Sequence, residues 1–319
     1  MLVLRGFHRS APSSTVLTIG NFDGVHRGHR ALLDQLVARA RRLGLPPAVL
    51  TFEPHPREFF DPKNAPTRLA TLREKLELLA DCGIEIVMVS RFNAAFAGLS
   101  ADAFVDQVIV RALRAKHVMI GDDFRYGAKR SGGFHHLQQK GAELGFQVEA
   151  MHSVLIDGER VSSSAVRAAL AAGRMDEAAG LLGRPYAFDG RVVHGDKRGR
   201  QLGFPTANIR VKHNPLPMMG VFAVEVRCQE GVVGGAADRC AVPGDYLKGV
   251  ANLGVRPTVE GTRPLLEINL FDYSGDLYGA HLNVRFVKKI REEIKFPGLD
   301  ALRAQIALDV AAARAHFNL

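Results

Sequence analysis

The sequence predicts two domains in succession: an α/β domain built on a parallel sheet, then a small antiparallel β-barrel followed by a C-terminal helix. Three observations predict this arrangement. The 319 residues are enough for two domains that each bury a core. The first half alternates short apolar runs with helical patterns, which is typical of a parallel sheet covered on both faces. The second half carries short alternating runs between Gly- and Pro-rich turns, which favours an antiparallel sheet or barrel.

Apolar runs and helical periodicity place the elements of the first half. The apolar runs predict strands over residues 15–20, 48–52, 84–89, 117–120 and 146–151. Apolar residues at helical spacing predict helices over residues 28–43, 71–82, 100–115 and 133–144. Gly83 and Gly145 follow two of these helices, and glycine commonly follows a helix C-terminus. Ligands of such sheets bind at the carboxyl ends of the strands, where most motifs of this half lie.

The pattern changes near residues 183–186 (GRPY), which divides the chain into predicted domains over 1–184 and 185–319. Beyond this point, short alternating runs predict strands over 187–194, 221–227, 249–254, 265–271 and 281–287. Residues 299–316 predict a closing amphipathic helix, and residues 229–247, rich in glycine, predict a flexible hairpin loop.

The charge balance excludes several classes of protein. Lys and Arg total 42 against 33 Asp and Glu, a net charge of +9, but the excess is spread over both halves without a basic tail. With no Trp and five Tyr for base stacking, this favours small phosphorylated ligands over nucleic acid. No apolar stretch approaches the ~18–20 residues that span a bilayer, and the N-terminus lacks a signal-peptide pattern. The sequence therefore predicts a cytoplasmic protein without nucleic-acid or membrane partners.

Residues 20–29 (GNFDGVHRGH) are the most informative segment of the first half, because they join the first strand to the first helix. His26 and His29 are three residues apart and share one face of the first helical turn if the helix begins at residues 25–27. The helix N-terminus attracts anions, and Gly20, Gly24 and Gly28 allow backbone to approach a phosphate. Two imidazoles there could stabilise the charge that develops on a nucleotide phosphate. A glycine-rich turn with two surface histidines is the plainer interpretation.

Three further segments favour the nucleotide site. Residues 161–167 (VSSSAVR) open a later helix with three hydroxyls and an arginine, which is a second phosphate-binding pattern. Residues 121–127 (GDDFRYG) and 51–56 (TFEPHP) each follow a strand, at the edge where ligands bind. The prolines of the second of these segments stiffen it.

In the second half, residues 190–208 (GRVVHGDKRGRQLGFPTAN) combine glycines, basic residues and a Thr and an Asn two apart. Thr206 and Asn208 would point to one side of an extended segment and could help to hold a phosphate-bound Mg²⁺. Glu267 lies opposite the apolar face of its strand, where it could accept a proton from a substrate hydroxyl. The alternatives, a hairpin with a polar turn and a solvated carboxylate, stay open on these residues alone.

Together these segments resemble the bacterial bifunctional riboflavin kinase/FAD synthetase family, and the resemblance covers residues 15–316. It implies a Rossmann-like nucleotidyltransferase domain that transfers AMP from ATP to FMN, and a β-barrel domain that phosphorylates riboflavin. By this resemblance the catalytic residues are His26, His29, Arg167 and Glu267. The implied ATP- and phosphate-binding residues are Gly20, Asn21, Phe22, Gly28, Ser162, Ser163, Ser164, Gly195, Lys197, Gly203, Thr206 and Asn208. The implied flavin-binding residues are Pro54, His55, Pro56, Asp123, Phe124, Asn252, Arg256, Arg291 and Phe296.

The resemblance also implies Mg²⁺ bound with ATP, near Thr206 and Asn208, and riboflavin, FMN, FAD and ATP as substrates and products. The oligomeric state stays open between a monomer and a transient oligomer. Two alternatives are also kept. The first domain could use another phosphorylated acceptor, or the chain could be a nucleotide- or RNA-binding regulator without catalysis. The presence of the candidate catalytic residues in both halves argues against the regulator.

Overall fold

The computed structural model describes residues 1–121, 124–151, 155–156, 159–195, 203–213, 215–228, 246–258 and 261–319. They fall into two compact units, one over Met1–Pro66 and Ala70–Ser162, the other over Thr67–Leu69 and Ser163–Leu319. Among these residues, none of the helices has the length and apolar character that crossing a membrane requires. The domain boundary at residues 184 and 185 stays a prediction.

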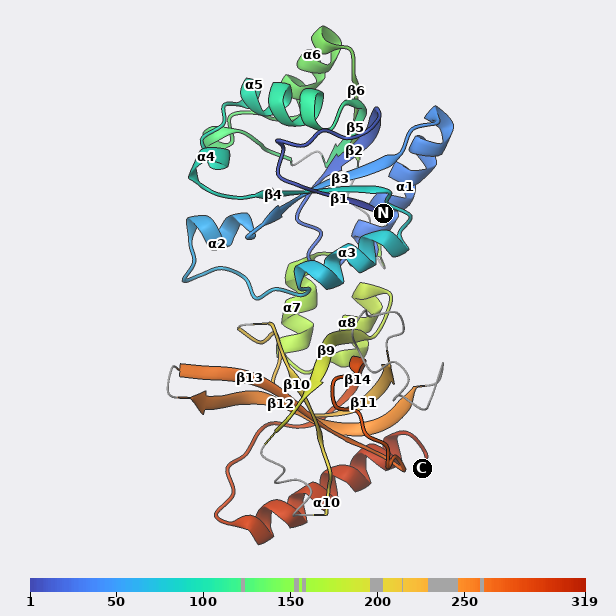
Figure 1. The fold of residues 1–319 in the computed structure, drawn as a ribbon, viewed down its shortest axis with the longest axis vertical. Helices are drawn as coiled ribbons and strands as arrows, with labels where there is room; N and C mark the ends of the chain where they lie inside the picture. The colour runs from blue at the N-terminus through green and yellow to red at the C-terminus, as the bar shows by residue number, and fades with distance from the viewer. Residues whose placement is uncertain are drawn as a thin grey trace. The chain divides into compact units, whose positions relative to one another are not determined.

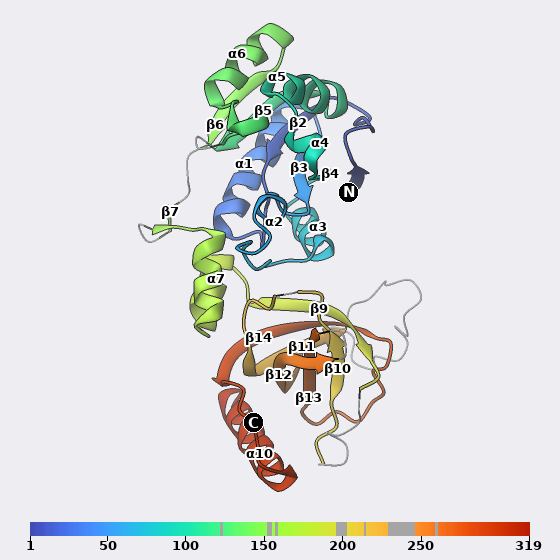
Figure 2. The same ribbon diagram turned by 90° about the vertical axis from the view of Figure 1, so that its left-hand side faces the viewer.

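The first unit is built on a six-stranded sheet in which every neighbouring pair is parallel (Figures 1 and 2). Its strand order is β1-β4-β3-β2-β5-β6. The strands are β1 (Leu2–Arg5), β2 (Thr15–Ile19), β3 (Pro47–Glu53), β4 (Ile86–Arg91), β5 (Ala115–Gly121) and β6 (Gln147–Met151). The predicted parallel sheet is confirmed, and β1 is an additional edge strand that the sequence pattern did not indicate.

Helices cover both faces of this sheet. The helical segments of this unit are α1 (Arg27–Leu43), α2 (Pro56–Phe60), α3 (Leu72–Asp81), α4 (Ala94–Ala97), α5 (Ala101–Phe104), the π-helix η1 (Val105–Ala112), the 3₁₀ turn η2 (Ala128–Arg130) and α6 (Phe134–Leu144). The helix predicted over residues 100–115 is therefore α5 continued in π geometry. A two-stranded hairpin of β7 (Leu155–Ile156) and β8 (Glu159–Arg160) completes the unit.

The central strands are apolar throughout because successive side chains point to opposite faces of the sheet, and each face is covered by a separate hydrophobic core. Val16 packs on one face with Leu33 and Leu36 of α1, while the next residue, Leu17, packs on the other face with Ile109 of η1. This burial on both faces is what makes parallel strands read as continuous apolar runs. It holds the carboxyl ends of β2, β3 and β5 on one rigid edge of the sheet.

The second unit is a closed six-stranded barrel in the order β10-β13-β12-β11-β14-β9, which confirms the predicted antiparallel barrel. Its strands are β9 (Tyr186–Val193), β10 (Ala207–Arg210), β11 (Gly220–Cys228), β12 (Leu247–Thr258), β13 (Gly261–Leu270) and β14 (His281–Arg291). The predicted loop over 229–247 lies outside the described residues up to residue 245, and β12 begins at Leu247. The short strand β10 was not predicted as a separate strand.

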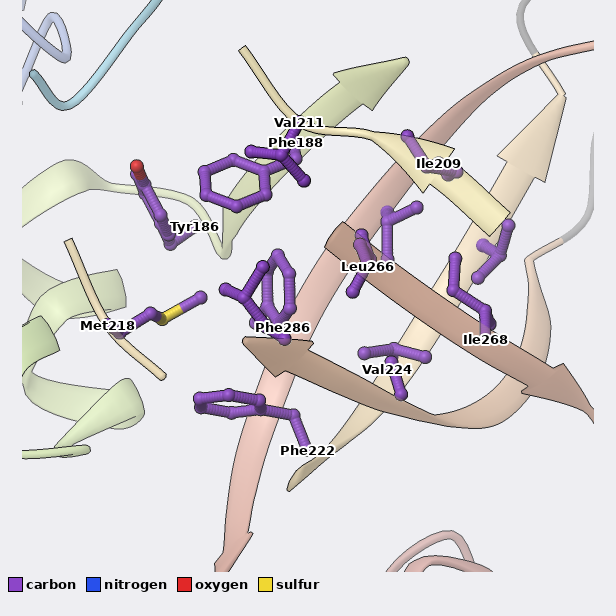
Figure 3. Close-up of a cluster of buried hydrophobic side chains, with 14 of the residues drawn as sticks. Tyr186, Phe188, Ile209, Val211, Met218, Phe222, Val224, Leu266, Ile268 and Phe286 are labelled. Carbon is purple, nitrogen blue, oxygen red and sulfur yellow. The ribbon is translucent and has the colours of Figure 1, made fainter. Parts of the chain in front are cut away.

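Aromatic and aliphatic side chains fill the barrel. Phe188, Phe222 and Phe286 meet edge to face with ring centroids 5.2 and 5.3 Å apart, and Leu266 and Ile268 of β13 lie in the same core (Figure 3). Helices α7 (Ser163–Ala171) and α8 (Met175–Leu182) contribute to this core as well. Helix α10 (Leu299–His316) follows the barrel strands and is the predicted C-terminal helix.

Candidate functional sites

The two histidines of residues 20–29 are brought together at the start of α1. His26 is the N-cap residue, and its Nδ1 accepts a hydrogen bond from the His29 backbone N–H at 3.2 Å. The two imidazole rings stack with centroids 3.7 Å apart, and His26 is buried. The predicted shared face is confirmed, and both rings lie where the helix dipole favours an anion.

His29 is held as a neutral imidazole. Burial lowers its pKa well below the usual value of 6.5, and the nearby His26 and Lys75 lower the pKa further. Its Nδ1 and the Oδ1 of Asn21 are buried and have no hydrogen-bond partner among the described residues. Buried polar atoms are rarely left unpaired in a folded protein, so two of them in one turn indicate a place for a polar ligand.

The turn itself is strained. Phe22 and Val25 adopt left-handed backbone conformations, with φ of 48° and 40°, which non-glycine residues rarely adopt. A Cβ on Gly28 would lie 3.2 Å from the His26 ring, so a side chain at this position would crowd that histidine. Thr51 of β3 supports the turn by donating a hydrogen bond to the Asn21 carbonyl at 3.2 Å. Strain of this kind is typical of functional sites.

A cavity of about 840 Å³ begins at Gly20 and Asn21 and extends along the carboxyl edge of the sheet. Its aromatic lining comprises Phe52, Phe60, Phe92, Phe96, Phe104, Phe124 and Tyr126. Its cationic lining comprises Arg57, Arg125, Lys129 and Arg130. Such a lining fits a large aromatic molecule that carries negative charge.

Several predicted residues belong to this cavity and others do not. His55, Pro56 and Phe124 line it, whereas Pro54 is absent from its lining. His55 also begins α2, where its side chain accepts the Arg57 N–H at 3.1 Å. Asp123 lies outside the described residues. The cationic lining was missed, although basic residues just after a predicted strand were a usable signal.

The predicted serine and arginine segment lies at the division between the units. Ser162 ends the first unit, and α7 of the second unit begins at Ser163 and carries Ser164 and Arg167. Arg167 donates from Nε to the Thr67 carbonyl of its own unit at 2.5 Å. The assignment of this segment to ATP phosphates stays a prediction.

In the second unit, strand register places three polar residues in one row across the outside of the barrel. Glu267 of β13 is paired with Asn208 of β10 on one side and with Asn252 of β12 on the other. The residues before and after Glu267, Leu266 and Ile268, point into the core. The predicted outward placement of Glu267 is thus confirmed, with an asparagine on each side of it.

Two cavities of this unit share Thr206. One, of about 300 Å³, is lined by Thr206, Asn252, Arg256, Glu267, Arg291 and Phe296 among others. The other, of about 420 Å³, is lined by Thr206, Pro205 and residues 273–278. The four predicted flavin-side residues of this half all line the first cavity. The loop over residues 273–278, which lines the second, was not singled out from the sequence.

Asn208 lies two residues after Thr206 and is paired with Glu267, but it is in the lining of neither cavity. Its Oδ1 is buried without a hydrogen-bond partner among the described residues, and Gly195 covers its amide so closely that a Cβ there would lie 2.4 Å from Nδ2. Gly203 has a positive φ of 88° that favours glycine. Lys197 lies outside the described residues. Within the described ranges, no group of three His, Cys, Asp or Glu side chains could hold a metal, so a cation here would need ligand phosphates.

Two ion pairs shape the smaller cavity. Arg256 Nη2 lies 2.8 Å from Glu267 Oε1. Arg291 donates hydrogen bonds of 2.8 and 2.6 Å to the two carboxylate oxygens of Asp309, a buried residue of α10. Asn252 donates to Glu293 Oε1 at 3.1 Å. The carboxylates of Glu293 and Asp309 were missed, because their partners are distant in sequence.

Comparison with known proteins agrees with this geometry. A family model described as FAD synthetase matches residues 8–165, and one described as riboflavin kinase matches residues 182–317. Bifunctional riboflavin kinase/FMN adenylyltransferases from Haemophilus influenzae and Escherichia coli K12 are 46% and 48% identical. The alignments cover 100% of this chain, and 100% and 99% of those proteins.

Among solved structures, one described as a macrolide-efflux protein from Streptococcus pneumoniae superposes with a TM-score of 0.80 at 28% identity. The match covers 98% of this chain and 99% of that one. The shared fold and the matches over the full length lead to one conclusion. The chain belongs to the bifunctional riboflavin kinase/FMN adenylyltransferase family.

Proposed function

We propose that this chain phosphorylates riboflavin to FMN with ATP in its second unit, and transfers AMP from ATP to FMN in its first, giving FAD and pyrophosphate. The observation that carries the proposal is the pair of dissimilar sites. The first unit has a large aromatic cavity with a cationic lining that begins at a histidine pair. The second has two cavities that share Thr206 beside a carboxylate.

In the first unit, a phosphate oxygen of FMN attacks the α-phosphorus of ATP and the bond to the β-phosphate oxygen breaks, so that pyrophosphate leaves with the electron pair. His26 and His29 stabilise the developing charge by donating N–H groups, since His29 is neutral when free of ligand. The aromatic lining holds the isoalloxazine ring, and the four cations of the lining favour the phosphorylated flavin over riboflavin. By family resemblance, Ser162, Ser163, Ser164 and Arg167 bind the ATP phosphates.

In the second unit, riboflavin occupies the cavity beside Glu267, and ATP occupies the cavity beside residues 273–278. The 5′-hydroxyl oxygen attacks the γ-phosphorus, Glu267 accepts the hydroxyl proton, and ADP leaves. The Arg256 ion pair uses Glu267 Oε1, so the proton goes to Oε2. Thr206 lines both cavities, which supports transfer between ligands bound in them.

A magnesium ion fits this site. The Thr206 hydroxyl and the buried Asn208 Oδ1 are neutral oxygens of the kind that Mg²⁺ accepts when phosphates supply the charge. When bound, the ion neutralises charge on the transferred phosphoryl group. We place the enzyme in the cytoplasm, with riboflavin, FMN, FAD and ATP as its small-molecule partners and with neither nucleic acid nor membrane among them.

Liquid chromatography of flavins after incubation with riboflavin, ATP and Mg²⁺ tests the proposal. Formation of both FMN and FAD supports the two activities. FMN alone would contradict the adenylyl-transfer half and favour another phosphorylated acceptor. Neither product, from a folded sample tried with oxidised and reduced flavin, would favour the non-catalytic regulator, which filter binding to RNA at two salt concentrations would test.

A further inference from the structure

We propose that Tyr126, His136 and Asp102 form a brace that holds the cationic loop 125–130 at the acceptor cavity, and that this brace sets the affinity of the first unit for its phosphorylated acceptor. The inference rests on the proposed adenylyl transfer. Tyr126 lines the cavity, whereas His136 and Asp102 do not. The latter two are positioning residues that act through Tyr126.

A continuous chain of polar contacts links the three residues. The Tyr126 hydroxyl lies 2.7 Å from His136 Nδ1, and His136 Nε2 lies 3.3 Å from Asp102 Oδ1. Lys140, one turn further along α6, contacts the same oxygen at 3.2 Å. The distances suit a chain in which the phenol donates to Nδ1 and the Nε2–H donates to the carboxylate.

The phenol is suited to a fixed hydrogen bond. Tyr126 is 5% exposed, and its ring packs against Phe104 and Phe124 with centroids 5.1 and 5.7 Å away. Burial and the Asp102 charge raise the pKa of Tyr126, so the hydroxyl keeps its proton and stays a donor. The Tyr126 ring therefore lines the cavity, while its hydroxyl contacts His136.

The loop that follows Tyr126 needs such support. Gly127, Lys129 and Arg130 all have left-handed backbone conformations, with φ of 73°, 55° and 59°. Two of them are not glycine, and such strain persists only where the surroundings impose it. Tyr126 and Gly132 close the loop by exchanging backbone hydrogen bonds of 3.1 and 2.9 Å.

The tyrosine ring lies directly over the closing glycine. A Cβ on Gly132 would come within 2.6 Å of the Tyr126 ring. Any other residue at position 132 would therefore displace the ring. Through Tyr126, the loop is tied to His136 on α6 and to Asp102 on α5. The positions of Arg125, Lys129 and Arg130 in the cavity lining therefore depend on these contacts.

The first test measures FAD formation from FMN and ATP. Tyr126→Phe keeps the ring and removes the hydrogen bond, and His136→Ala removes the other partner. A hydrogen bond of ordinary net strength predicts that KM for FMN rises ~3- to 10-fold in each, with kcat changed less than ~2-fold. KM for FMN in the double variant should be no higher than in the single variant with the higher KM, because both substitutions remove the same interaction. His135→Ala, on the exposed neighbouring histidine, is the matched control and should leave KM unchanged.

The second test follows the loop without activity. Trypsin cleaves after lysine and arginine, so loss of the brace should speed cleavage at Lys129 and Arg130, read by mass spectrometry. Far-UV circular dichroism and the urea unfolding midpoint of each variant report that its first unit is folded. Unchanged KM and unchanged cleavage in Tyr126→Phe, with the wild type forming FAD, would overturn the brace alone. A wild type that forms no FAD would instead overturn the proposed function on which the brace rests.

Discussion

The carboxylate of Glu267 lies 2.8 Å from the guanidinium of Arg256, which reaches it from the neighbouring strand β12. The pair is partly exposed and faces a cavity, so its main effect is to orient Glu267 rather than to stabilise the barrel. Arg256 binds the Oε1 atom of Glu267. This contact fixes the orientation of the carboxylate and therefore the direction in which Oε2 points. In the proposed mechanism, this contact orients the carboxylate that accepts the hydroxyl proton of riboflavin.

We expect Glu267→Gln to lower the rate of FMN formation from riboflavin by ~10²- to 10⁴-fold, because the amide cannot accept the hydroxyl proton. The substitution keeps the size of the side chain, so folding should be unaffected. FAD formation from supplied FMN is the internal control and should continue at the wild-type rate. Loss of both activities in a folded variant would contradict the separation of the two sites.

His29→Ala should lower FAD formation from FMN by ~10²- to 10³-fold, the usual effect of removing one donor from a charge-stabilising site. Riboflavin phosphorylation, measured in the same sample by chromatography, should be unchanged. A variant that forms FAD within ~3-fold of the wild-type rate would remove His29 from the catalytic group.

The lowered pKa of His29 predicts how stability depends on pH. The unfolded chain binds a proton on this histidine near pH 6.5, whereas the folded chain does so only at lower pH. The unfolded state therefore binds more protons in this window, and the free energy of unfolding falls as pH drops below 6.5. His29→Phe should flatten this part of the profile in urea unfolding. An equally steep profile in the variant would contradict the assignment.

Lys75 contributes to the same shift by its positive charge. It is buried on α3 with Nζ 3.5 Å from the Thr51 hydroxyl, behind the turn that carries the histidines. Lys75→Met should raise the pKa of His29, though not to its ordinary value, because burial is the larger cause. Imidazole NMR titration measures this directly. Arg73→Met, at an exposed position of the same helix, is the control and should not move the His29 pKa.

The pairing of Arg291 with Asp309 anchors α10 beside the kinase cavity. Asp309 is nearly fully buried, so Asp309→Ala deprives the guanidinium of its carboxylate and should lower the free energy of unfolding by about 2–3 kcal/mol. Asp272, whose carboxylate is mostly exposed, pairs with Arg314 of the same helix. Asp272→Ala is the matched control, with a loss of less than about 1 kcal/mol. Urea denaturation compares the two, and equal losses would contradict the anchoring role.

The sequence was sufficient for the elements whose side chains follow a simple period. Most strands of both units and α1 are examples. The turn at His26 and His29 is another, since all its residues are adjacent in the chain. The edge strand β1 was missed because four residues are too few for a periodic signal. Helix η1 was expected as ordinary α-helix, because π geometry leaves little trace in the apolar pattern.

The missed site residues depend on distant partners. Lys75 lies in a helix with an ordinary apolar pattern, and only packing against β3 reveals that its charge is buried near His29. Asp309 similarly sits among alanines of an amphipathic helix, and its partner Arg291 is on β14. The contact of Arg256 with Glu267 requires the register of β12 on β13, which no local pattern specifies.

Complementation between two variants tests the central claim, that separate sites in one chain carry the two steps. His29→Ala given riboflavin, ATP and Mg²⁺ should stop at FMN, and Glu267→Gln should leave riboflavin unchanged. A mixture of the two variants should form FAD, because FMN released by one is the substrate of the other. Failure of the mixture to form FAD, with each variant folded and retaining its own single activity, would contradict this account.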